Sequence, residues 1–368
     1  MMIKKCVVVL PLVAAMIFTG CKGSVVEDIG NLAQQNIETI EYIDDCQRTV
    51  IIPKEIETIV PSGGVSQIIL YSVAPEKFAA ITSTWKESSM EYIPEEYKKL
   101  PFLGDLYDSS EANIEELAAI NPQLIIDIGE SKKSLAEDMD SLQDKTMVAS
   151  VHIDGTITTM PEVYRKLGKL LGKEEKAEEL AVYCEKILAQ TDEVMKKVGD
   201  NKVRALYITG EDGLSVLAKG TYHAEIFDML TTNVAVIDGP ARKGTGNEVS
   251  IEQIALWNPE YMIFAPGSIY SSAKERDVFK ELSAITEGKY LEVPCGPYNW
   301  MGSPPSVQCY LSMIWLTSEL YPEYCDFDAE AEIKEYYRLF YDFELTDEGY
   351  EKLMGLSDEG HSIFLRRS

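Results

Sequence analysis

Two copies of one short sequence constrain the fold of this chain more than any other feature. Residues 113–126, NIEELAAINPQLII, align without a gap with residues 250–263, SIEQIALWNPEYMI, sharing Ile, Glu, Ala, Asn, Pro and a final Ile. Each copy predicts a short amphipathic helix that leads into an apolar strand. Because proline cannot continue a helix and favours an extended conformation before it, we expect Asn-Pro to end both helices. Helix-strand units can resemble one another by chance, but the fixed spacing from Glu to Pro favours a duplicated βαβ unit.

The segment midway between the two copies predicts one long helix. Residues 173–198, KEEKAEELAVYCEKILAQTDEVMKKV, carry apolar side chains at spacings of three and four. At 1.5 Å per residue such a helix covers on the order of 35 Å, about a domain diameter. A shorter helix precedes it, for which Gly172 is the expected cap. We therefore expect a rigid helix between two α/β lobes.

Strand and helix patterns alternate on both sides of this helix, as expected of an α/β protein. The predicted strands are 48–53, 58–60, 77–82, 124–128, 146–150, 203–209, 214–218, 234–238, 261–265 and 289–294. Further helices are expected in 61–73, 224–230, 274–282, 305–322 and 331–343. The predicted organisation is a signal peptide (1–20), a tether (21–41), an N-terminal lobe (42–157), a helical region (158–200), a C-terminal lobe (201–325), and a helix with a tail (326–368).

The first residues have the pattern of an export signal. A basic start, MMIKK, precedes an apolar run that is too short to span a bilayer. Thr19-Gly20-Cys21 then resembles the bacterial lipobox, although Phe18 stands where Leu is usual. This resemblance implies a lipidated, palmitate-bearing Cys21 and an extracytoplasmic chain held at the cell membrane by its lipid anchor alone. The alternative is an ordinary secretory peptide with an incidental cysteine.

Charge and composition exclude several classes of partner and site. The formal net charge of −27 argues against nucleic acid and against an anionic membrane surface, both of which need basic patches. Only three histidines occur, so a metal site built from several His ligands is not expected. There is no CxxC pair, but an exported chain permits a disulfide, for which Cys295 and Cys309 are the closest pair among Cys46, Cys184, Cys295, Cys309 and Cys325.

Several motifs in a fixed order resemble one family. They are DDCQRTVIIP (44–53, with Gln47 where the family has Gly), the two repeat copies, VFKELSAITEGKYLEVP (278–294) and WLTSELYP (315–322). Together with the lipoprotein start, they make roughly residues 42–325 similar to the substrate-binding proteins of ABC importers for iron-siderophore complexes, haem and cobalamin. The resemblance implies two Rossmann-like lobes joined by a single long helix, and a monomer that serves a permease dimer with ATPase subunits.

The resemblance also gives the repeated glutamates a role. In this family each lobe presents one exposed Glu at the start of such a helix, and the pair docks on arginines of the two permease subunits. By position these are Glu115 and Glu252. Two acidic groups at a fixed separation would give oriented docking. The alternative is a carboxylate favoured at a helix start by the helix dipole.

Loops at the carboxyl ends of the strands are the expected ligand site, because open α/β sheets bind ligands there. In the first lobe these loops contain Ser62, Gly63, Gly64, Trp85 and Tyr107. The two glycines precede a helix and offer N–H groups to an anion, unless they form a plain tight turn.

In the second lobe the corresponding loops contain Tyr222, His223, Arg242, Tyr298 and Trp300. Aromatic walls suit a large planar ligand, whereas Arg and N–H donors suit an oxyanion, so the ligand class stays open. His223 is either an axial haem ligand or a hydrogen-bonding residue. Arg242 either pairs with an anionic ligand or lies on the surface, and Trp300 is either a ligand contact or a lid packed on the core.

The sequence thus predicts a non-enzymatic binding protein that captures a chelated metal, such as a ferric siderophore or haem, and needs no cofactor of its own. Cobalamin or another corrinoid, and molybdate or tungstate, are alternative ligands. A further alternative is an adhesion or signalling lipoprotein that serves no permease. An enzyme has no support, since the chain contains neither GxSxG nor HExxH.

Overall fold

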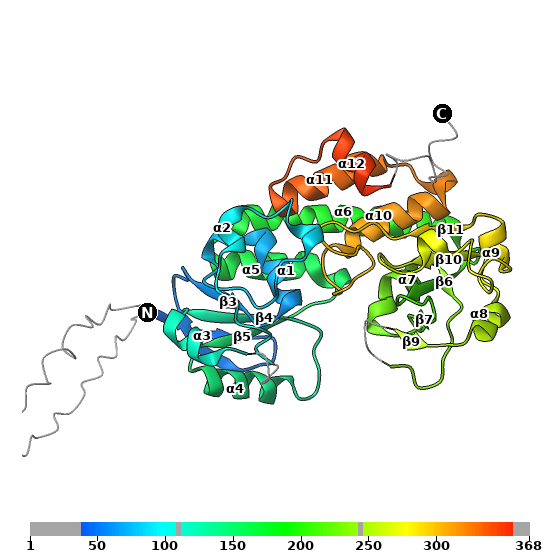
Figure 1. Ribbon diagram of the computed structural model, residues 1–368. Coiled ribbons are helices and arrows are strands. Elements are labelled where there is room, and N and C mark those ends of the chain that lie inside the picture. The colour runs from blue at the N-terminus through cyan, green and yellow to red at the C-terminus, as the bar shows by residue number, and fades with distance from the viewer. Residues whose placement is uncertain (1–37, 108–111, 242–245, 356–368) are drawn as a thin grey trace, which may run out of the picture. The chain divides into compact units, whose positions relative to one another are not determined.

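The computed structural model describes residues 38–107, 112–241 and 246–355, which belong to one compact unit that begins at Glu38 (Figure 1). The predicted signal peptide with Cys21, and Arg242, lie outside the described residues. Within the described ranges, no helix combines the length and the apolar content that a bilayer span requires.

The first half of the chain forms a parallel sheet in the order β3-β4-β5. Its strands are β3 (Ile59–Pro61), β4 (Leu124–Gly129) and β5 (Ser150–Asp154), and β1 (Thr39–Ile43) pairs antiparallel with β2 (Thr49–Pro53) nearby. The helices of this half are α1 (Gly64–Val73), α2 (Glu95–Lys98), α3 (Ile114–Ile120) and α4 (Leu135–Thr146). Strand β1 begins at Thr39, so the last residues of the predicted tether lie in a strand.

The predicted long helix is present. It is α6 (Glu174–Val198), 25 residues long, and α5 (Met160–Leu171) packs against it. Gly172 ends α5 with φ = 65°, the left-handed conformation that glycine adopts at low cost. Both helices are amphipathic and bury their apolar faces in the main core.

The second half forms a larger sheet in the order β11-β10-β6-β7-β9, with β8 also paired to β6. The strands are β6 (Arg204–Thr209), β7 (Ser215–Val216), β8 (Thr232–Asn233), β9 (Asn247–Glu248), β10 (Tyr261–Phe264) and β11 (Tyr290–Glu292). The helices that accompany them are α7 (Glu225–Leu230), α8 (Ile251–Trp257) and α9 (Ser283–Thr286). The predicted α/β fold class is confirmed.

The two repeat copies occupy equivalent places. Helix α3 leads into β4 between β3 and β5, and α8 leads into β10 between β6 and β11, with parallel pairing in both cases. The expected extended residue before proline is wrong, because Asn121 and Asn258 are left-handed, with φ of 50° and 45°. Asparagine tolerates this conformation, and its N–H caps the last turn of each helix.

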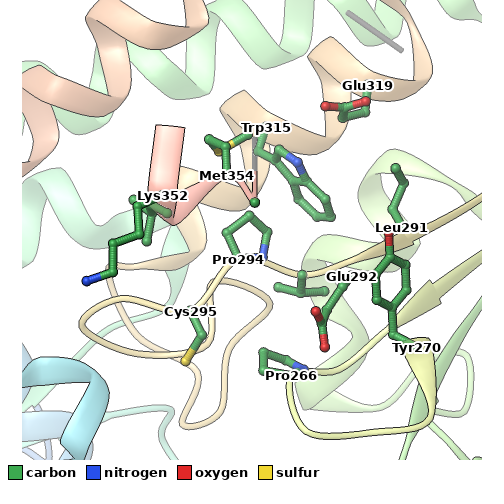
Figure 2. A pocket seen from close by; sticks show the side chains of 13 residues that line it. Pro266, Tyr270, Leu291, Glu292, Pro294, Cys295, Trp315, Glu319, Lys352 and Met354 are labelled. Carbon is green, nitrogen blue, oxygen red and sulfur yellow. The ribbon is translucent and has the colours of Figure 1, made fainter. Parts of the chain in front are cut away.

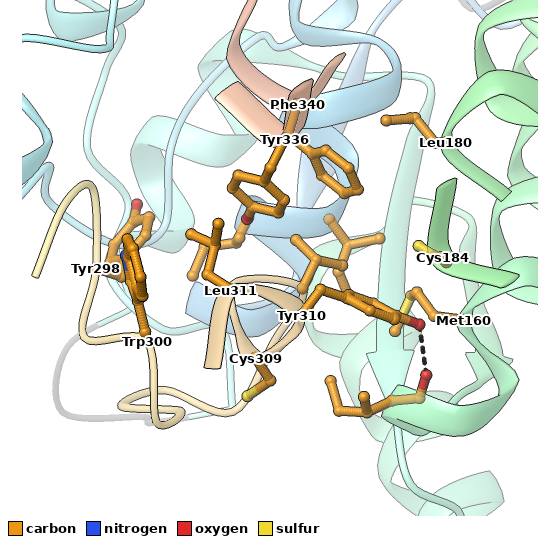
Figure 3. Close-up of a cluster of buried hydrophobic side chains, with 14 of the residues drawn as sticks. Met160, Leu180, Cys184, Tyr298, Trp300, Cys309, Tyr310, Leu311, Tyr336 and Phe340 are labelled. Atoms are coloured by element: carbon orange, nitrogen blue, oxygen red, sulfur yellow. Dashed lines mark hydrogen bonds between the residues drawn. The ribbon is translucent and has the colours of Figure 1, made fainter. Parts of the chain in front are cut away.

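Three helices complete the described chain: α10 (Cys309–Leu320), α11 (Ala329–Tyr341) and α12 (Asp347–Leu353). Helix α10 is buried along almost its whole length, and α11 lies along it and along α1 and α6 (Figure 1). Tyr310 on α10 donates a hydrogen bond of 2.6 Å to the carbonyl of Ile157, which joins the second half of the chain to the first (Figure 3).

Four predicted elements differ in the structure. Residues 77–82 form only isolated bridges, and the strand expected at 146–150 begins at Ser150 because α4 extends to Thr146. The strand expected at 234–238 is replaced by β8 two residues earlier. Residues 274–282 form successive turns rather than a helix, and their apolar spacing buries Phe279 and Leu282 in the second core cluster.

The five cysteines of the described residues are free thiols, so the permitted Cys295–Cys309 disulfide is not formed.

Candidate ligand-binding site

A buried polar network lies below the first-lobe loop. Ser62 follows β3 and donates a hydrogen bond of 2.5 Å to Asp127 on β4, whose other oxygen lies 2.6 Å from Nδ1 of His152 on β5. Asp127 and His152 are register partners in the sheet, so their side chains share one face. All three residues are buried, and Nε2 of His152 has no hydrogen-bond partner among the described residues. The network therefore fixes the position of Ser62.

Tyr107 lies next to this network. Burial, and then the charge of Asp127, raise the pKa of its phenol well above the usual range. Its hydroxyl contacts the sulfur of Met139 at 2.9 Å. The residue as a whole is 41% exposed, and the Lys132 ammonium lies 5.9 Å from its ring centre. Tyr107 therefore presents an aromatic face to solvent beside a cation.

The structure places a carboxylate beside the loop glycines that we expected to offer N–H groups to an anion. An ideal Cβ at Gly63 would lie 3.0 Å from a carboxylate oxygen of Asp105, and Gly64 begins α1 with partial exposure. Asp105 also accepts a hydrogen bond from the Tyr107 N–H. This loop is consequently negative near the start of the helix and disfavours a second anion.

The second-lobe residues Tyr222 and His223 lie in the 3₁₀ turn that directly precedes α7, and both are partly buried. Burial lowers the pKa of His223, and the backbone of Gly302 forms a hydrogen bond with its ring that acts in the opposite direction. Burial raises the pKa of Tyr222 to about 12. His223 is thus brought next to the loop that contains Tyr298 and Trp300.

Two acidic residues that we did not single out, one from each lobe, interact electrostatically in this region. Burial raises the pKa of Glu225 on α7, and the negative charge of Glu130, which directly follows β4 of the first lobe, raises it further. Glu130 also contributes to the raised pKa of Tyr222. The carboxyl ends of the two sheets therefore approach each other with like charges.

Three aromatic candidates are packed inside the protein. Trp300, which has no exposed surface, and Tyr298 are both buried (Figure 3). Trp300 donates a hydrogen bond of 3.0 Å to the Gly296 carbonyl, and the buried Trp85 donates one to the carbonyl of Tyr97. Trp300 thus has the packing of a core lid.

The repeated glutamates are both exposed. Glu115 and Glu252 lie in the first turns of α3 and α8, where the side chains of Asn113 and Ser250 cap the helices. Among the described residues neither carboxylate has an ion-pair partner. Hydrogen bonds from its own N–H and from Ser250 lower the pKa of Glu252, which keeps it charged.

A separate cavity of about 290 Å³ lies beyond β11, where α10 and the end of α12 approach it (Figure 2). Its lining includes Tyr270, Glu292, Cys295, Trp315, Leu353 and Met354. None of the predicted ligand residues lines it. In the described part of the chain, no three His, Cys, Asp or Glu side chains are grouped as metal ligands.

One feature of the sequence could have identified a residue near the candidate site that we did not predict. Asp127 interrupts the apolar strand LIIDI, and a charged residue in a buried strand needs partners. Glu130 and Glu225 give no such signal, because each looks like an ordinary surface carboxylate until the two lobes are folded together.

A chain with two α/β sheets, a 25-residue helix between them and loops at the facing carboxyl ends of the strands has the architecture of an extracytoplasmic solute-binding protein. Residues 69–294 match the family model described as "Periplasmic binding protein". The chain belongs to this family, whose members are transport proteins and not enzymes.

Solved structures agree with this assignment. A solute-binding protein of an ABC transporter from Sulfurospirillum deleyianum is 24% identical, with a TM-score of 0.78 over 86% of this chain and 99% of that chain. A Haemophilus influenzae binding protein with bound molybdate is 20% identical, with a TM-score of 0.65 over 84% and 99%. A Vibrio cholerae binding protein for catecholate siderophores is 16% identical, with a TM-score of 0.53 over 75% and 98%. No curated protein matches the chain.

Proposed function

We propose that this solute-binding protein captures a chelated metal between its two lobes and delivers it to an ABC permease. The observation that carries the choice of ligand is the combination of aromatic and acidic groups at the carboxyl ends of the strands. Tyr107 and Tyr222 offer aromatic surface, while Asp105, Glu130 and Glu225 give the loops negative charge. Large ligands with an organic shell need aromatic and apolar walls.

The charge of the site favours particular chelates. Catecholate siderophores and molybdate carry negative charge, which Asp105, Glu130 and Glu225 oppose, whereas ferric hydroxamates are neutral or positive. Among the described residues of this site, Lys132 supplies a positive charge, and its ammonium lies over the ring of Tyr107. We therefore put ferric hydroxamate first among the ligands, ahead of haem, cobalamin, catecholate siderophores and molybdate.

A thermal-unfolding panel on residues 22–368 tests this choice. Ligands bound only by the folded state stabilise it by about 2.7 kcal/mol at a hundred times the dissociation constant, which raises the melting temperature. We expect ferric hydroxamate to give the largest rise, with metal-free hydroxamate as the control for the organic shell. A rise with molybdate or ferric catecholate alone would contradict the charge argument, and no rise with any ligand would contradict capture of a chelate.

We further propose Glu115 and Glu252 as the docking groups for the two permease subunits. Both are exposed and charged at equivalent places in the two lobes. Two fixed acidic groups can steer and orient a basic partner surface. We also propose that Cys21 is lipidated and holds the chain at the outer side of the cell membrane, on the basis of its lipobox-like context.

A further inference from the structure

The end of the described chain packs against both halves of the molecule. We name residues 329–354, which comprise α11 and α12, the C-terminal strap. On α11, Phe340 packs on Tyr164 and Tyr183, with ring centres 6.0 and 5.6 Å apart, and Tyr341 packs on Tyr71 of α1 at 5.7 Å. The strap lies outside the matched family segment, residues 69–294.

The strap is also joined to α6, the helix between the two lobes, by hydrogen bonds from α6 side chains to backbone carbonyls of the strap. Tyr183 donates a hydrogen bond of 2.9 Å to the carbonyl of Glu332, and the Lys176 ammonium donates one of 2.6 Å to the carbonyl of Leu339. Lys334 pairs with Glu330 on its own helix and with Asp347 on α12, so the two strap helices are held together. The strap is thus fixed to α6 along much of α11.

The carbonyl of Gly296 joins the strap to the second-lobe loop that contains Tyr298 and Trp300. We name residues 294–305, which contain Tyr298 and Trp300, the aromatic loop. The hydroxyl of Tyr337 on the strap donates a hydrogen bond to the carbonyl of Gly296, which also accepts the bond from Trp300. The ring of Tyr92, from the first lobe, lies 5.0 Å from that of Tyr337. An ideal Cβ at Gly296 would lie 2.8 Å from Leu353 of the strap and 3.0 Å from the Tyr92 hydroxyl, so the junction is tightly packed.

A second contact ties the same loop to the first lobe. Ser88 donates a hydrogen bond of 2.8 Å to the carbonyl of Pro297. At its far end the loop contacts His223 through Gly302, as described above. The aromatic loop therefore extends from the strap junction to a candidate ligand residue.

We infer that Tyr337 is a positioning residue: through Gly296 the C-terminal strap holds the aromatic loop in the conformation that places it behind the ligand. The strap contacts α1, α6 and the aromatic loop. If the aromatic loop moved together with the second lobe and away from the first, contacts of the strap would be broken, so the strap opposes this movement. The inference relies on the proposed function only for the ligand's position.

A matched pair of variants tests this inference without any ligand. Tyr337→Phe removes the hydroxyl that reaches Gly296, whereas Tyr336→Phe removes an equally buried hydroxyl that makes no hydrogen bond to the aromatic loop. Hydrogen exchange is followed in peptides that contain the amides of Trp300 and Gly302, which bond within the loop. One lost hydrogen bond of ordinary strength should speed this exchange roughly fivefold in Tyr337→Phe, and Tyr336→Phe should leave it unchanged.

A purely structural role for Tyr337 would lower the melting temperature and speed exchange throughout the protein. The positioning role predicts faster exchange confined to the aromatic loop and the segment around Tyr92. Gly296→Ala provides a second perturbation, since its Cβ would force Leu353 away. We expect the same local increase in this variant. Unchanged loop exchange in Tyr337→Phe and Gly296→Ala, or equal increases in Tyr336→Phe, would overturn the inference and leave the proposed ligand untouched.

Discussion

At the scale of single residues, Asp127 is the clearest case of a side chain whose role depends on its partners. It lies in a strand that is otherwise apolar, and its two oxygens meet Ser62 and His152. A buried carboxylate is tolerated when its hydrogen bonds are satisfied, and removal of such a group leaves the partners unpaired. The network therefore stabilises the loop that begins at Ser62.

We expect Asp127→Ala to lower the free energy of unfolding by about 2–4 kcal/mol, because His152 loses its partner inside the protein and Ser62 keeps only its hydrogen bond with Ser66. Urea unfolding measures this change. Asp140→Ala is the control, since Asp140 pairs with Arg48 at the surface and its loss should cost less than about 1 kcal/mol. Similar costs for the two variants would show that the network does not stabilise the fold.

The candidate site was predictable in part at this scale. The family resemblance implies that Glu115 and Glu252 are exposed, and the structure exposes both. The sequence does not decide whether Trp300 is a ligand contact or a packed lid, because a Pro- and Gly-rich loop has no periodicity from which burial can be inferred. In the structure Trp300 is buried and bonds to the Gly296 carbonyl, which also accepts a hydrogen bond from Tyr337 of the strap, a residue distant in sequence.

At the scale of elements, the repeat predicted the structure well because each copy contains its own start and stop signals. Asn113 and Ser250 cap the helix starts, and Asn121 and Asn258 end them in the left-handed conformation. Residues 274–282 give only a periodic apolar pattern without such start and stop signals, and this pattern predicts a helix where the structure has turns. Their apolar residues have helical spacing, yet Phe279 and Leu282 reach the core from consecutive turns, and spacing alone does not distinguish these structures.

The left-handed caps lead to a prediction. Asn258→Ala should lower the free energy of unfolding by about 1 kcal/mol, because alanine is disfavoured at positive φ, while Asn258→Gly should cost less, since it loses only the exposed hydrogen bond from Ser283. Asn121 should respond in the same way, since its φ is similar. Thermal and urea unfolding of the four variants measure the difference. If alanine and glycine are equivalent at both positions, the left-handed conformation does not limit these helix ends.

At the scale of the whole molecule, a small and a larger sheet, one long helix and a C-terminal strap place loops from both halves next to each other. The sequence predicted the sheets and the helix from periodicity and from the repeat. It did not predict the network at Asp127, the opposition of Glu130 and Glu225, or the strap junction, because each joins residues from separate elements. Such contacts exist only after the tertiary structure has formed.

Uptake of a radiolabelled ferric hydroxamate by cells that express the full chain tests the central claim most directly. The variant E115K/E252K reverses the two proposed docking charges, and E55K/E281K makes the same charge change at two other exposed glutamates. We predict that E115K/E252K loses at least about tenfold in uptake, a docking cost of roughly 1.4 kcal/mol, while binding of the chelate stays normal and E55K/E281K transports as the original chain does. Normal uptake by E115K/E252K, or the absence of chelate uptake in the original chain, would contradict the account and favour a lipoprotein that serves no permease.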